Sequence, residues 1–289
     1  MGLTPGVSMQ FCSPLRYPGG KGKLANFLKN IFLHNNIIDG TYIEPYAGGA
    51  SIAIFLLLHK IVQNIIINDL DFVIYAFWRT ILDKPDWICS KIYNTNIDIK
   101  TWYLQREINK NPFKYDLYDV GFSTFFMNRT NRSGIISAGM IGGKNQSGKY
   151  KIDCRFNKIN LINRITSIAK FKEKISLYHT DALDLINNIV HLNYNTLIYF
   201  DPPYFNKSHT LYKNSYTSHD HDLIAKTVQS IPTPWIITYD NCDYIKNLYR
   251  KCRYVNLTIN YSAYKNGLAG NELLFYNNLI IPYTCSSLS

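Results

Sequence analysis

The sequence predicts an α/β protein built on a mainly parallel β-sheet covered by helices on both faces. Short apolar runs of strand length alternate with helical segments, which is the pattern of such sheets. Two of the runs end in a carboxylate, Glu44 and Asp69, at the position where open α/β sheets bind ligands. The length of 289 residues suits one large domain, or a domain that carries a smaller insertion. A hydrophobic fraction of 46% can fill a sizeable core, so a wholly disordered chain is excluded.

The strands are predicted from short runs rich in Ile, Leu, Val and aromatic residues, several of them bounded by polar or turn residues. They cover residues 41–44, 64–69, 175–179, 196–200, 235–239, 254–260 and 273–279. A helix is predicted after each of the first five strands, at residues 50–59, 71–82, 181–189, 219–230 and 243–251. The last two strands have no clear helix between them, which predicts a C-terminal antiparallel hairpin.

Positive charge is concentrated in the middle of the chain. The whole sequence has 31 Lys+Arg against 20 Asp+Glu, a net charge of +11. Residues 84–177 hold 17 Lys+Arg and 7 Asp+Glu, a net of +10, and the remainder holds 14 and 13, a net of +1. Because basic segments favour phosphate-bearing partners, we predict that residues 84–177 form an insertion that faces phosphate groups. Residues 1–83 and 178–289 then form the domain that contains the sheet.

Several classes of protein are disfavoured by composition. The longest apolar run, residues 52–58, is far shorter than the roughly 20 residues that span a bilayer. The first ten residues have neither the basic start nor the apolar stretch of a secretory signal, so a cytoplasmic location is expected. The six cysteines contain no Cys-x-x-Cys pair and do not cluster with the seven histidines. We therefore expect buried free thiols and no metal site.

The first candidate binding segment is the strand–turn–helix around Pro45-Tyr46-Ala47-Gly48-Gly49. The glycines allow close approach of the backbone to a ligand, and the helix that follows directs N–H groups towards it. Asp69 lies 20 residues beyond Gly49, where a carboxylate can accept hydrogen bonds from ribose hydroxyls. The dinucleotide fingerprint G-x-G-x-x-G is absent, so an adenosyl ligand is favoured over a nicotinamide or a flavin.

The second candidate segment is Asp201-Pro202-Pro203-Tyr204, which follows an apolar strand. The prolines remove two N–H donors and leave carbonyl groups that accept hydrogen bonds. Asp201 and the Pro202 carbonyl can accept the two hydrogens of an amino group, while Tyr204 can stack on a flat ring. The segment therefore has the features of a receptor for an amino-bearing base. A third segment, residues 14–21, contains Gly19-Gly20-Lys21 and can form a loop over a ligand.

Taken together, these segments resemble the Dam-type (D12 class) DNA N6-adenine methyltransferases, which use S-adenosylmethionine. The resemblance covers nearly the whole chain, with the motifs in the family's order. It implies a Rossmann-like methyltransferase fold with a seven-stranded sheet. It also implies that residues 84–177, before the catalytic motif, form an inserted, mostly helical target-recognition domain that binds DNA. The residues that it implies for cofactor binding are Tyr17, Gly19, Gly20, Lys21, Glu44, Pro45, Tyr46, Ala47, Gly48, Gly49, Asp69, Asp181, Ala182 and Asp201. The catalytic residues that it implies are Asp201, Pro202, Pro203 and Tyr204.

Within the insertion, residues 128–134 (Asn-Arg-Thr-Asn-Arg-Ser-Gly) resemble the segment that reads or clamps DNA in relatives. The Asn-Val-Pro-Phe-Gly-like run of the family is missing, and residues 137–148 take its place. The recognition sequence is therefore not carried over from the family. The DNA-binding residues that we predict from this segment and from its basic neighbours are Asn128, Arg129, Asn131, Arg132, Lys144 and Lys149.

The sequence thus predicts an enzyme that methylates N6 of an adenine flipped out of duplex DNA. Methylation of N4 of cytosine is the nearest alternative, because the same tetrad can hold either amino group. Methylation of RNA or of a protein glutamine is disfavoured, because the tetrad begins with Asp201 and the insertion is basic. A DNA-binding homologue without catalytic activity stays open, because intact motifs do not prove turnover. A companion restriction endonuclease would be a natural partner.

Overall fold

The computed structural model describes residues 12–16, 21–37, 39–189, 195–205, 216–260 and 269–282. The chain divides into two compact units. The helical unit comprises Met1–Leu28, Gly49–Lys60 and Val73–Glu173. The sheet unit comprises Lys29–Gly48, Ile61–Phe72 and Lys174–Ser289. That residues 84–177 form a separate DNA-binding domain stays a prediction.

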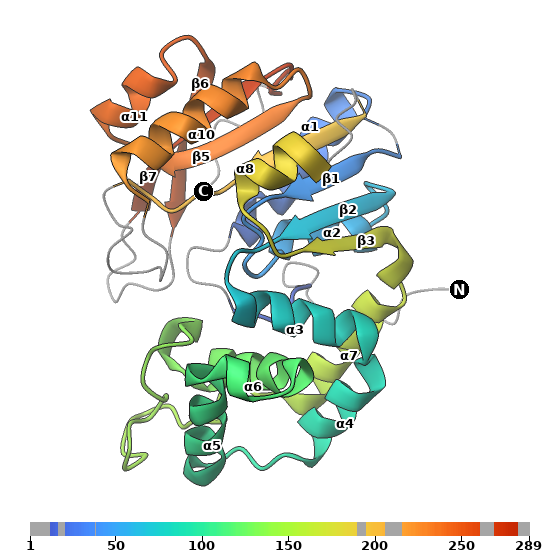
Figure 1. The fold of residues 1–289 in the computed structure, drawn as a ribbon, viewed down its shortest axis with the longest axis vertical. Coiled ribbons are helices and arrows are strands. Elements are labelled where there is room, and N and C mark those ends of the chain that lie inside the picture. Colours follow the sequence, from blue (N-terminus) through green and yellow to red (C-terminus); the bar gives the residue numbers. More distant parts are fainter. Residues whose placement is uncertain are drawn as a thin grey trace. The chain divides into compact units, whose positions relative to one another are not determined.

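The sheet unit contains seven strands in one mixed sheet, in the order β3-β2-β1-β4-β5-β7-β6 (Figure 1). The strands are β1 (Thr41–Glu44), β2 (Asn64–Asn68), β3 (Ile175–Tyr178), β4 (Thr196–Phe200), β5 (Trp235–Asp240), β6 (Arg253–Asn260) and β7 (Ala269–Asn277). Strands β1 to β5 run parallel. Strand β7 is antiparallel to both β5 and β6. The predicted mainly parallel sheet and its C-terminal antiparallel hairpin are confirmed.

The parallel strands bring their carboxyl ends to one edge of the sheet, which we call the carboxyl edge. Strand β7 runs the other way, so it contributes its amino end there. Its residue Glu272 pairs with Asp240, the last residue of β5. A side chain near the start of β7 therefore lies beside side chains that end the parallel strands.

The core of the sheet unit lies between the sheet and its helices. Helix α10 (Ser218–Ser230) begins with a capping box in which Thr217 and Asp220 bind each other's backbone N–H groups. Its buried Ile224 and Val228 belong to one apolar cluster with Trp235 of β5. Apolar residues at positions i and i+4 lie on one face of a helix, which is the face that α10 buries. Among the described residues, the other helices of this unit are α11 (Asp243–Leu248), α8 (Ala182–Asp184) and the π-helix η5 (Leu185–Ile189). Most of helix α1 (Ala25–His34) also belongs to this unit.

The helical unit consists of α-helices and short 3₁₀ turns within the part of the chain that is described. Helix α1 (Ala25–His34) begins in it and ends in the sheet unit. Its other elements are η1 (Gly22–Leu24), α2 (Ser51–Leu58), α3 (Phe72–Asp83), α4 (Pro85–Asn94), α5 (Ile99–Lys110), η2 (Pro112–Lys114), α6 (Leu117–Thr130), η3 (Arg132–Gly134), α7 (Lys158–Ala169) and η4 (Lys172–Lys174). The part of the chain between residues 84 and 177 is therefore mostly helical, as predicted.

Helices α3 and α6 approach each other closely at Gly121. A Cβ atom at this position would lie 2.0 Å from the Thr80 hydroxyl oxygen, so only glycine fits. Beside this contact, Phe77 of α3 stacks on Phe125 of α6 with ring centroids 6.1 Å apart. Phe156 packs edge-on against Phe125 at 5.4 Å. Aromatic residues thus build the core of the helical unit, and α6 is buried along most of its length.

Three predictions about local structure need correction. The last strand is β7, from Ala269 to Asn277, instead of residues 273–279, because backbone pairing with β5 and β6 extends it through polar residues. The predicted helix at 181–189 is a short α-helix followed by a π-helix. The described cysteines carry thiols instead of disulfides, but none is buried, and Cys154 is exposed. Cys285 lies outside the described residues.

Two further observations concern membranes and metals. Among the described residues, no helix is long and apolar enough to cross a membrane. In the same part of the chain, no three side chains of His, Cys, Asp or Glu are placed to hold a metal ion.

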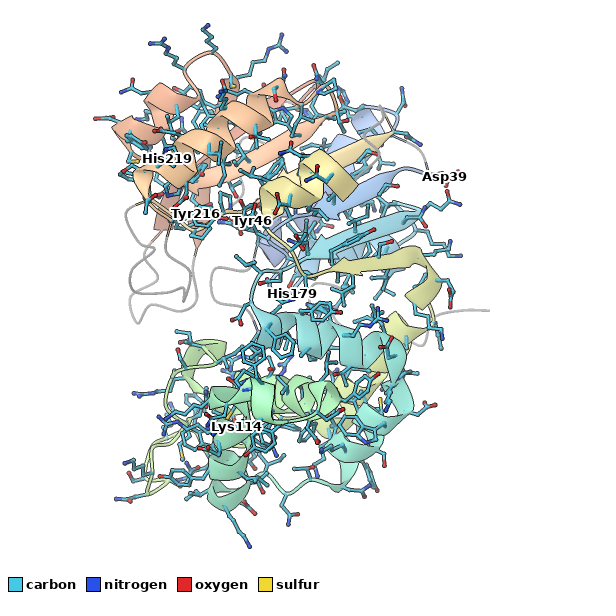
Figure 2. The ribbon with its side chains drawn as sticks, in the orientation of Figure 1. Asp39, Tyr46, Lys114, His179, Tyr216 and His219 are labelled. Carbon is cyan, nitrogen blue, oxygen red and sulfur yellow. The ribbon has the colours of Figure 1, made fainter. Side chains whose placement is uncertain are left out.

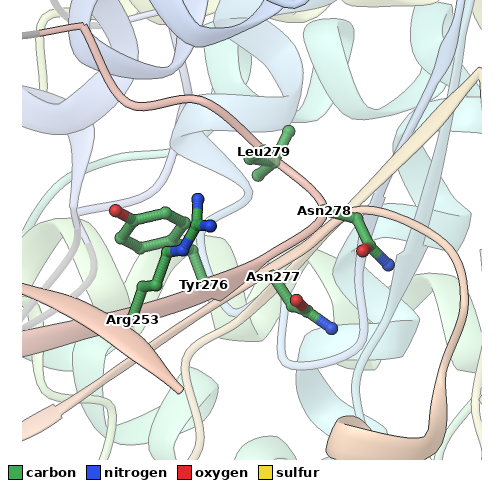
Figure 3. A pocket seen from close by; sticks show the side chains of 5 residues that line it. All are labelled: Arg253, Tyr276, Asn277, Asn278 and Leu279. Atoms are coloured by element: carbon green, nitrogen blue, oxygen red, sulfur yellow. The ribbon is translucent and has the colours of Figure 1, made fainter.

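A pocket lies at the edge of the sheet opposite the carboxyl edge (Figure 3). Its lining residues are Arg253, Tyr276, Asn277, Asn278 and Leu279. Asn277 pairs with Trp235, the first residue of β5, which places the pocket at the amino ends of the parallel strands. Ligands of open α/β sheets bind at the other edge, so this pocket is separate from the candidate active site.

Candidate active site

The carboxyl edge of the sheet carries an acidic residue at or just beyond the end of six strands. These residues are Glu44 of β1, Asp69 after β2, Asp181 after β3, Asp201 after β4, Asp240 of β5 and Glu272 of β7. A row of carboxylates favours ligands that carry positive charge or several N–H and O–H donors. The site is therefore suited to a cationic ligand with hydroxyl and amino groups.

Asp69 is held by the turn that follows β1. Its carboxylate accepts hydrogen bonds from the N–H groups of Gly48 at 2.8 Å and Asp71 at 2.9 Å. Gly48 has φ +47°, in the left-handed region that glycine adopts at the lowest cost, so glycine is favoured at this position of the turn. Burial raises the pKa of Asp69 to about 7, although the two N–H groups oppose this effect. The carboxylate thus changes its charge near neutral pH.

Asn68 joins the ends of three strands and was not predicted as a site residue. Its side-chain amide donates to the carbonyl groups of Pro45 at 2.9 Å and Thr180 at 3.0 Å. Its side-chain oxygen accepts the Thr180 N–H at 3.1 Å. The side chain is fully buried. Asn68 therefore fixes the turns that carry Gly48 and Asp181 relative to Asp69.

Two tyrosines lie against each other beside this turn. Tyr216 donates a hydrogen bond from its hydroxyl to that of Tyr46 at 3.2 Å, and the rings meet edge to face (Figure 2). Asp181, one of the residues predicted to bind the cofactor, accepts the Leu183 N–H at 2.8 Å and so caps α8. Ala182 is buried behind it. The aromatic pair and the acid lie at the same edge as Asp69.

Asp201, the first residue of the tetrad, is oriented by β5. The Thr238 hydroxyl donates to one of its carboxylate oxygens at 2.9 Å. Tyr199 shares a hydrogen bond with the same Thr238 hydroxyl at 2.9 Å. Burial, followed by the negative charges of Asp201, Glu272 and Glu44, raises the pKa of Tyr199 well above its usual value. Three carboxylates therefore act on one buried hydroxyl, which stays protonated at neutral pH.

Tyr204, the last residue of the tetrad, is held by β7. Its hydroxyl donates to the carboxylate of Glu272 at 2.5 Å, and both side chains are buried. The next residue, Phe205, donates its backbone N–H to Asp240 at 2.9 Å. Pro202 and Pro203 between them are also buried. The tetrad is thus fixed at one end by β5 and at the other end by β5 and β7.

The chemistry of this edge fits S-adenosylmethionine and an amino-bearing base. The ligand's sulfonium and amino groups are cationic, and its ribose and adenine supply O–H and N–H donors to carboxylates. Gly48 adds no side chain to the turn after β1, and Asp69 lies directly against that turn. The tetrad offers a carboxylate, two carbonyls without neighbouring N–H donors and an aromatic ring.

The order of the strands and the carboxyl edge of the sheet define the class of the protein. It has a Rossmann-like methyltransferase fold. Residues 17–263 match the family of D12 class N6 adenine-specific DNA methyltransferases, and the chain belongs to this family. The protein is therefore an adenine-specific DNA methyltransferase, and its methyl donor is S-adenosylmethionine.

Two relatives are similar in sequence over about two thirds of the chain. Type II methyltransferase M.MjaIII of Methanocaldococcus jannaschii is 23% identical, covering 71% of this chain and 73% of that protein. Modification methylase StsI of Streptococcus sanguinis is 28% identical, covering 66% of this chain and only 28% of that longer protein. The structure of rRNA methyltransferase aviRa from Streptomyces viridochromogenes has a TM-score of 0.35 at 10% identity, covering 86% of this chain and 82% of that one. This last similarity is too distant to carry an argument.

The predicted cofactor residues fall into three groups. Glu44 to Gly48, Asp69, Asp181, Ala182 and Asp201 lie in the sheet unit, at its carboxyl edge. Lys21 and Gly49 belong to the helical unit, where the Ser13 hydroxyl donates to the Gly49 carbonyl at 2.5 Å. Tyr17, Gly19 and Gly20 lie outside the described residues.

Three of the predicted DNA-binding residues are buried in the helical unit. Asn128 accepts the Arg16 N–H at 2.7 Å and donates to the carbonyls of Arg16 at 2.9 Å and Gly134 at 2.8 Å. Arg129 donates from Nε to the Pro14 carbonyl at 2.7 Å and also binds it through Nη2. Asn131 accepts the indole N–H of Trp102 at 2.7 Å. In this structure the three side chains form hydrogen bonds with groups of the helical unit itself. Their contact with DNA stays a prediction.

The other three predicted DNA-binding residues, Arg132, Lys144 and Lys149, are exposed. Sequence reasoning also missed the residues that support the tetrad, which are Thr238, Asp240 and Glu272. A signal existed for Asp240, because it ends an apolar strand as Glu44 does. No local signal marks Glu272, because its role depends on a tyrosine 68 positions earlier in the chain.

Proposed function

We propose that the tetrad Asp201–Tyr204 holds the adenine that is methylated, after this base has been flipped out of duplex DNA. The observation that carries the proposal is the position of the tetrad at the carboxyl edge, oriented by Thr238 and Glu272. Flipping is required because the amino group of a stacked, paired base is out of reach, and it costs a few kcal/mol that pocket contacts offset.

In this proposal the chain's groups activate the amino nitrogen of adenine. S-adenosylmethionine supplies a methyl group on a positively charged sulfur. Asp201 and the Pro202 carbonyl accept the two N6 hydrogens, which frees the nitrogen lone pair from the ring. The bound cofactor would supply a methyl group that leaves its sulfur without the C–S bonding electrons, the N6 lone pair would accept this methyl group, and Asp201 would take one N6 proton and pass it to water. The carboxylates of the edge stabilise the positive charge on nitrogen.

Replacing Asp201 tests this assignment. Asp201→Ala is expected to lower the turnover number by about 100-fold or more, the usual cost of removing a group that stabilises transition-state charge. Asp39→Asn is a matched control, because Asp39 is exposed and its left-handed backbone also suits Asn. Circular dichroism and binding of the cofactor establish that both variants are folded. Wild-type turnover by folded Asp201→Ala would remove Asp201 from the mechanism.

Mass spectrometry of nucleosides after incubation with duplex DNA and labelled cofactor identifies the product. We expect N6-methyladenine. N4-methylcytosine as the main product would replace the adenine proposal for this site. Binding of cofactor and DNA with neither product would make the chain a DNA-binding homologue without activity.

The remaining roles follow the same proposal. Glu44, the turn at Gly48, Asp69, Asp181 and Lys21 hold the cofactor. Residues 84–177 recognise the target sequence, with Arg132, Lys144 and Lys149 as exposed contacts to DNA. Removing one of these cations should weaken binding and lower its dependence on salt.

We further propose that a restriction endonuclease accompanies the enzyme in the cytoplasm, where its DNA substrate would lie. The names of the two relatives, a type II methyltransferase and a modification methylase, support this partner. Methylation-aware sequencing of DNA from cells that make the protein would give the modified site. Plasmid from these cells should then resist an endonuclease that cuts at this site, and cleavage at wild-type rate would argue against a protective role.

A further inference from the structure

Two arginines of the helical unit bind the short segment of residues 12–16, and a third arginine is part of this segment. Arg129 binds the Pro14 carbonyl through two of its nitrogens. Arg164 donates from Nη1 to the neighbouring Ser13 carbonyl at 2.9 Å. Arg16 belongs to the segment itself. Burial, followed by the charges of Arg164, Arg16 and Arg155, lowers the pKa of Arg129 to about 9, which identifies Arg155 as the fourth member. We call these four residues the arginine cluster.

The arginine cluster contains no negative charge. All 20 Asp and Glu residues lie in the part of the chain that is described, and none of them forms an ion pair with Arg16, Arg129, Arg155 or Arg164. Like charges at short range repel, and the repulsion grows as burial lowers the dielectric. Burial and the charge of Arg155 also lower the pKa of Arg16. Such an arrangement is stable when an anion neutralises it.

Two N–H donors of the arginine cluster are buried and have no partner. These are Nη1 of Arg16 and Nε of Arg164. A buried guanidinium N–H without an acceptor costs about 1–3 kcal/mol or more. Both side chains are only half-buried, so part of each lies at the surface beside its buried donor. A bound oxyanion would give either donor an acceptor, and guanidinium groups fit phosphate oxygens well.

The exposed side of the arginine cluster continues onto an aromatic ring. Arg155 is exposed and lies 6.0 Å from the ring centroid of Tyr150, which is itself 56% exposed. Lys149 lies 5.8 Å from the same ring. A ring between cations is typical of surfaces that take a sugar or base next to a phosphate. A small carboxylate ligand needs one cation. This surface offers two, Arg155 and Lys149, beside one aromatic ring, which suits a nucleotide better.

We propose that Arg16, Arg155 and Arg164 bind a backbone phosphate of DNA, with Tyr150 and Lys149 against the adjoining nucleotide. Arg129 is the buried member that holds the backbone beneath this phosphate site. The site rests on the proposed function, because it takes DNA as the source of the phosphate. It differs from the predicted contacts, since Arg16, Arg155 and Arg164 were not among them and Arg129 acts on the protein's own backbone.

The test is the salt dependence of DNA binding by the double variant Arg16→Gln/Arg155→Gln. These changes spare the fold, because Asn128 binds the backbone of Arg16 and Arg155 is exposed. Lys226→Gln removes one exposed cation on α10 of the sheet unit, outside residues 84–177, and serves as the control. Binding of a fluorescent 30-base-pair duplex is followed by anisotropy between about 50 and 200 mM NaCl, where phosphate contacts dominate the salt effect.

The double variant should bind at least about tenfold more weakly at the lowest salt, and the slope of log K against log[NaCl] should fall by about 1, the value for one phosphate. The control should keep the wild-type slope, and all three proteins should have the same melting temperature and cofactor affinity. An unchanged slope would overturn the site. A loss of cofactor affinity with DNA binding intact would instead assign the anion to the cofactor's carboxylate and also overturn it. Because binding needs no methyl transfer, a wild-type protein that methylates no DNA would refute the proposed function without affecting this result.

Discussion

The raised pKa of Asp69, together with its predicted contact with the ribose, leads us to expect that cofactor binding changes with pH near neutrality. Burial raises this pKa to about 7, against the opposing hydrogen bonds from Gly48 and Asp71. If a ribose hydroxyl donates to Asp69, the bound state requires the ionised carboxylate. About nine tenths of the unliganded protein is protonated at Asp69 at pH 6, and about one tenth at pH 8. The apparent Kd should therefore fall about tenfold between these values, and binding at pH 7 should release about half a proton.

Titration calorimetry measures both quantities. The ligand should be 5′-methylthioadenosine, which carries the ribose but lacks the α-amino group, since that group titrates near pH 8. Running the titration at pH 7 in buffers of different ionisation enthalpy gives the number of protons released. Asp69→Asn should bind more weakly, with an affinity that does not change between pH 6 and pH 8. A wild-type affinity that is flat over this range, or an equal slope in the variant, would refute the assignment of Asp69 to the ribose.

Three further predictions concern buried hydrogen bonds. Glu272→Ala leaves the Tyr204 hydroxyl without this acceptor and should lower the free energy of unfolding by about 1–3 kcal/mol, whereas Glu272→Gln keeps an acceptor and should cost less. Urea denaturation distinguishes them, and equal losses would contradict the role of this bond. Asn128→Ala removes three hydrogen bonds to backbone and should cost about 2–3 kcal/mol in the same assay; unchanged stability with weaker DNA binding would instead make Asn128 a DNA contact. Burial lowers the pKa of His221, so the unfolded chain takes up a proton more readily, and stability should fall as pH drops through about 6.5. Melting curves from pH 8 to pH 5 should show a smaller loss for His221→Gln, and parallel losses in both proteins would assign the effect to other groups.

The sheet could be predicted from sequence because its signal is local. Strands β1 and β4 have the predicted bounds, since each is an apolar run between polar or turn residues. Strand β7 was misplaced at its start because residues 270–272 are polar. They pair as strand because β5 and β6 supply backbone partners on both sides, and Glu272 is buried because Tyr204 donates to it. Neither cause can be read from the residues around position 272.

The segment at residues 128–134 shows a different limit. Its Asn and Arg residues were predicted to contact DNA, because amide and guanidinium groups suit base edges and phosphates. The same groups suit the protein backbone equally well, which presents carbonyl and N–H groups of the same kind. The partner of Asn128 lies 112 residues away in sequence, at Arg16. The type of residue therefore identifies the hydrogen-bonding capacity, and only the fold identifies the partner.

The boundaries of the basic segment differ from the boundaries of the helical unit, because the distribution of charge and the packing of side chains are different physical properties. The excess of Lys and Arg between residues 84 and 177 predicts where the chain binds phosphate groups. The helical unit that contains this segment also includes residues 1–28 and 49–60. Helix α2 belongs to it with six buried residues, and the Ser13–Gly49 bond lies within it. A hydrogen bond from Arg129 or Asn128 to residues 14–16 thus acts inside a single packed unit. The residues that precede Gly19-Gly20-Lys21 are bound by side chains at the end of α6, so a substitution of Asn128 or Arg129 should also disturb the chain that leads to this predicted cofactor motif.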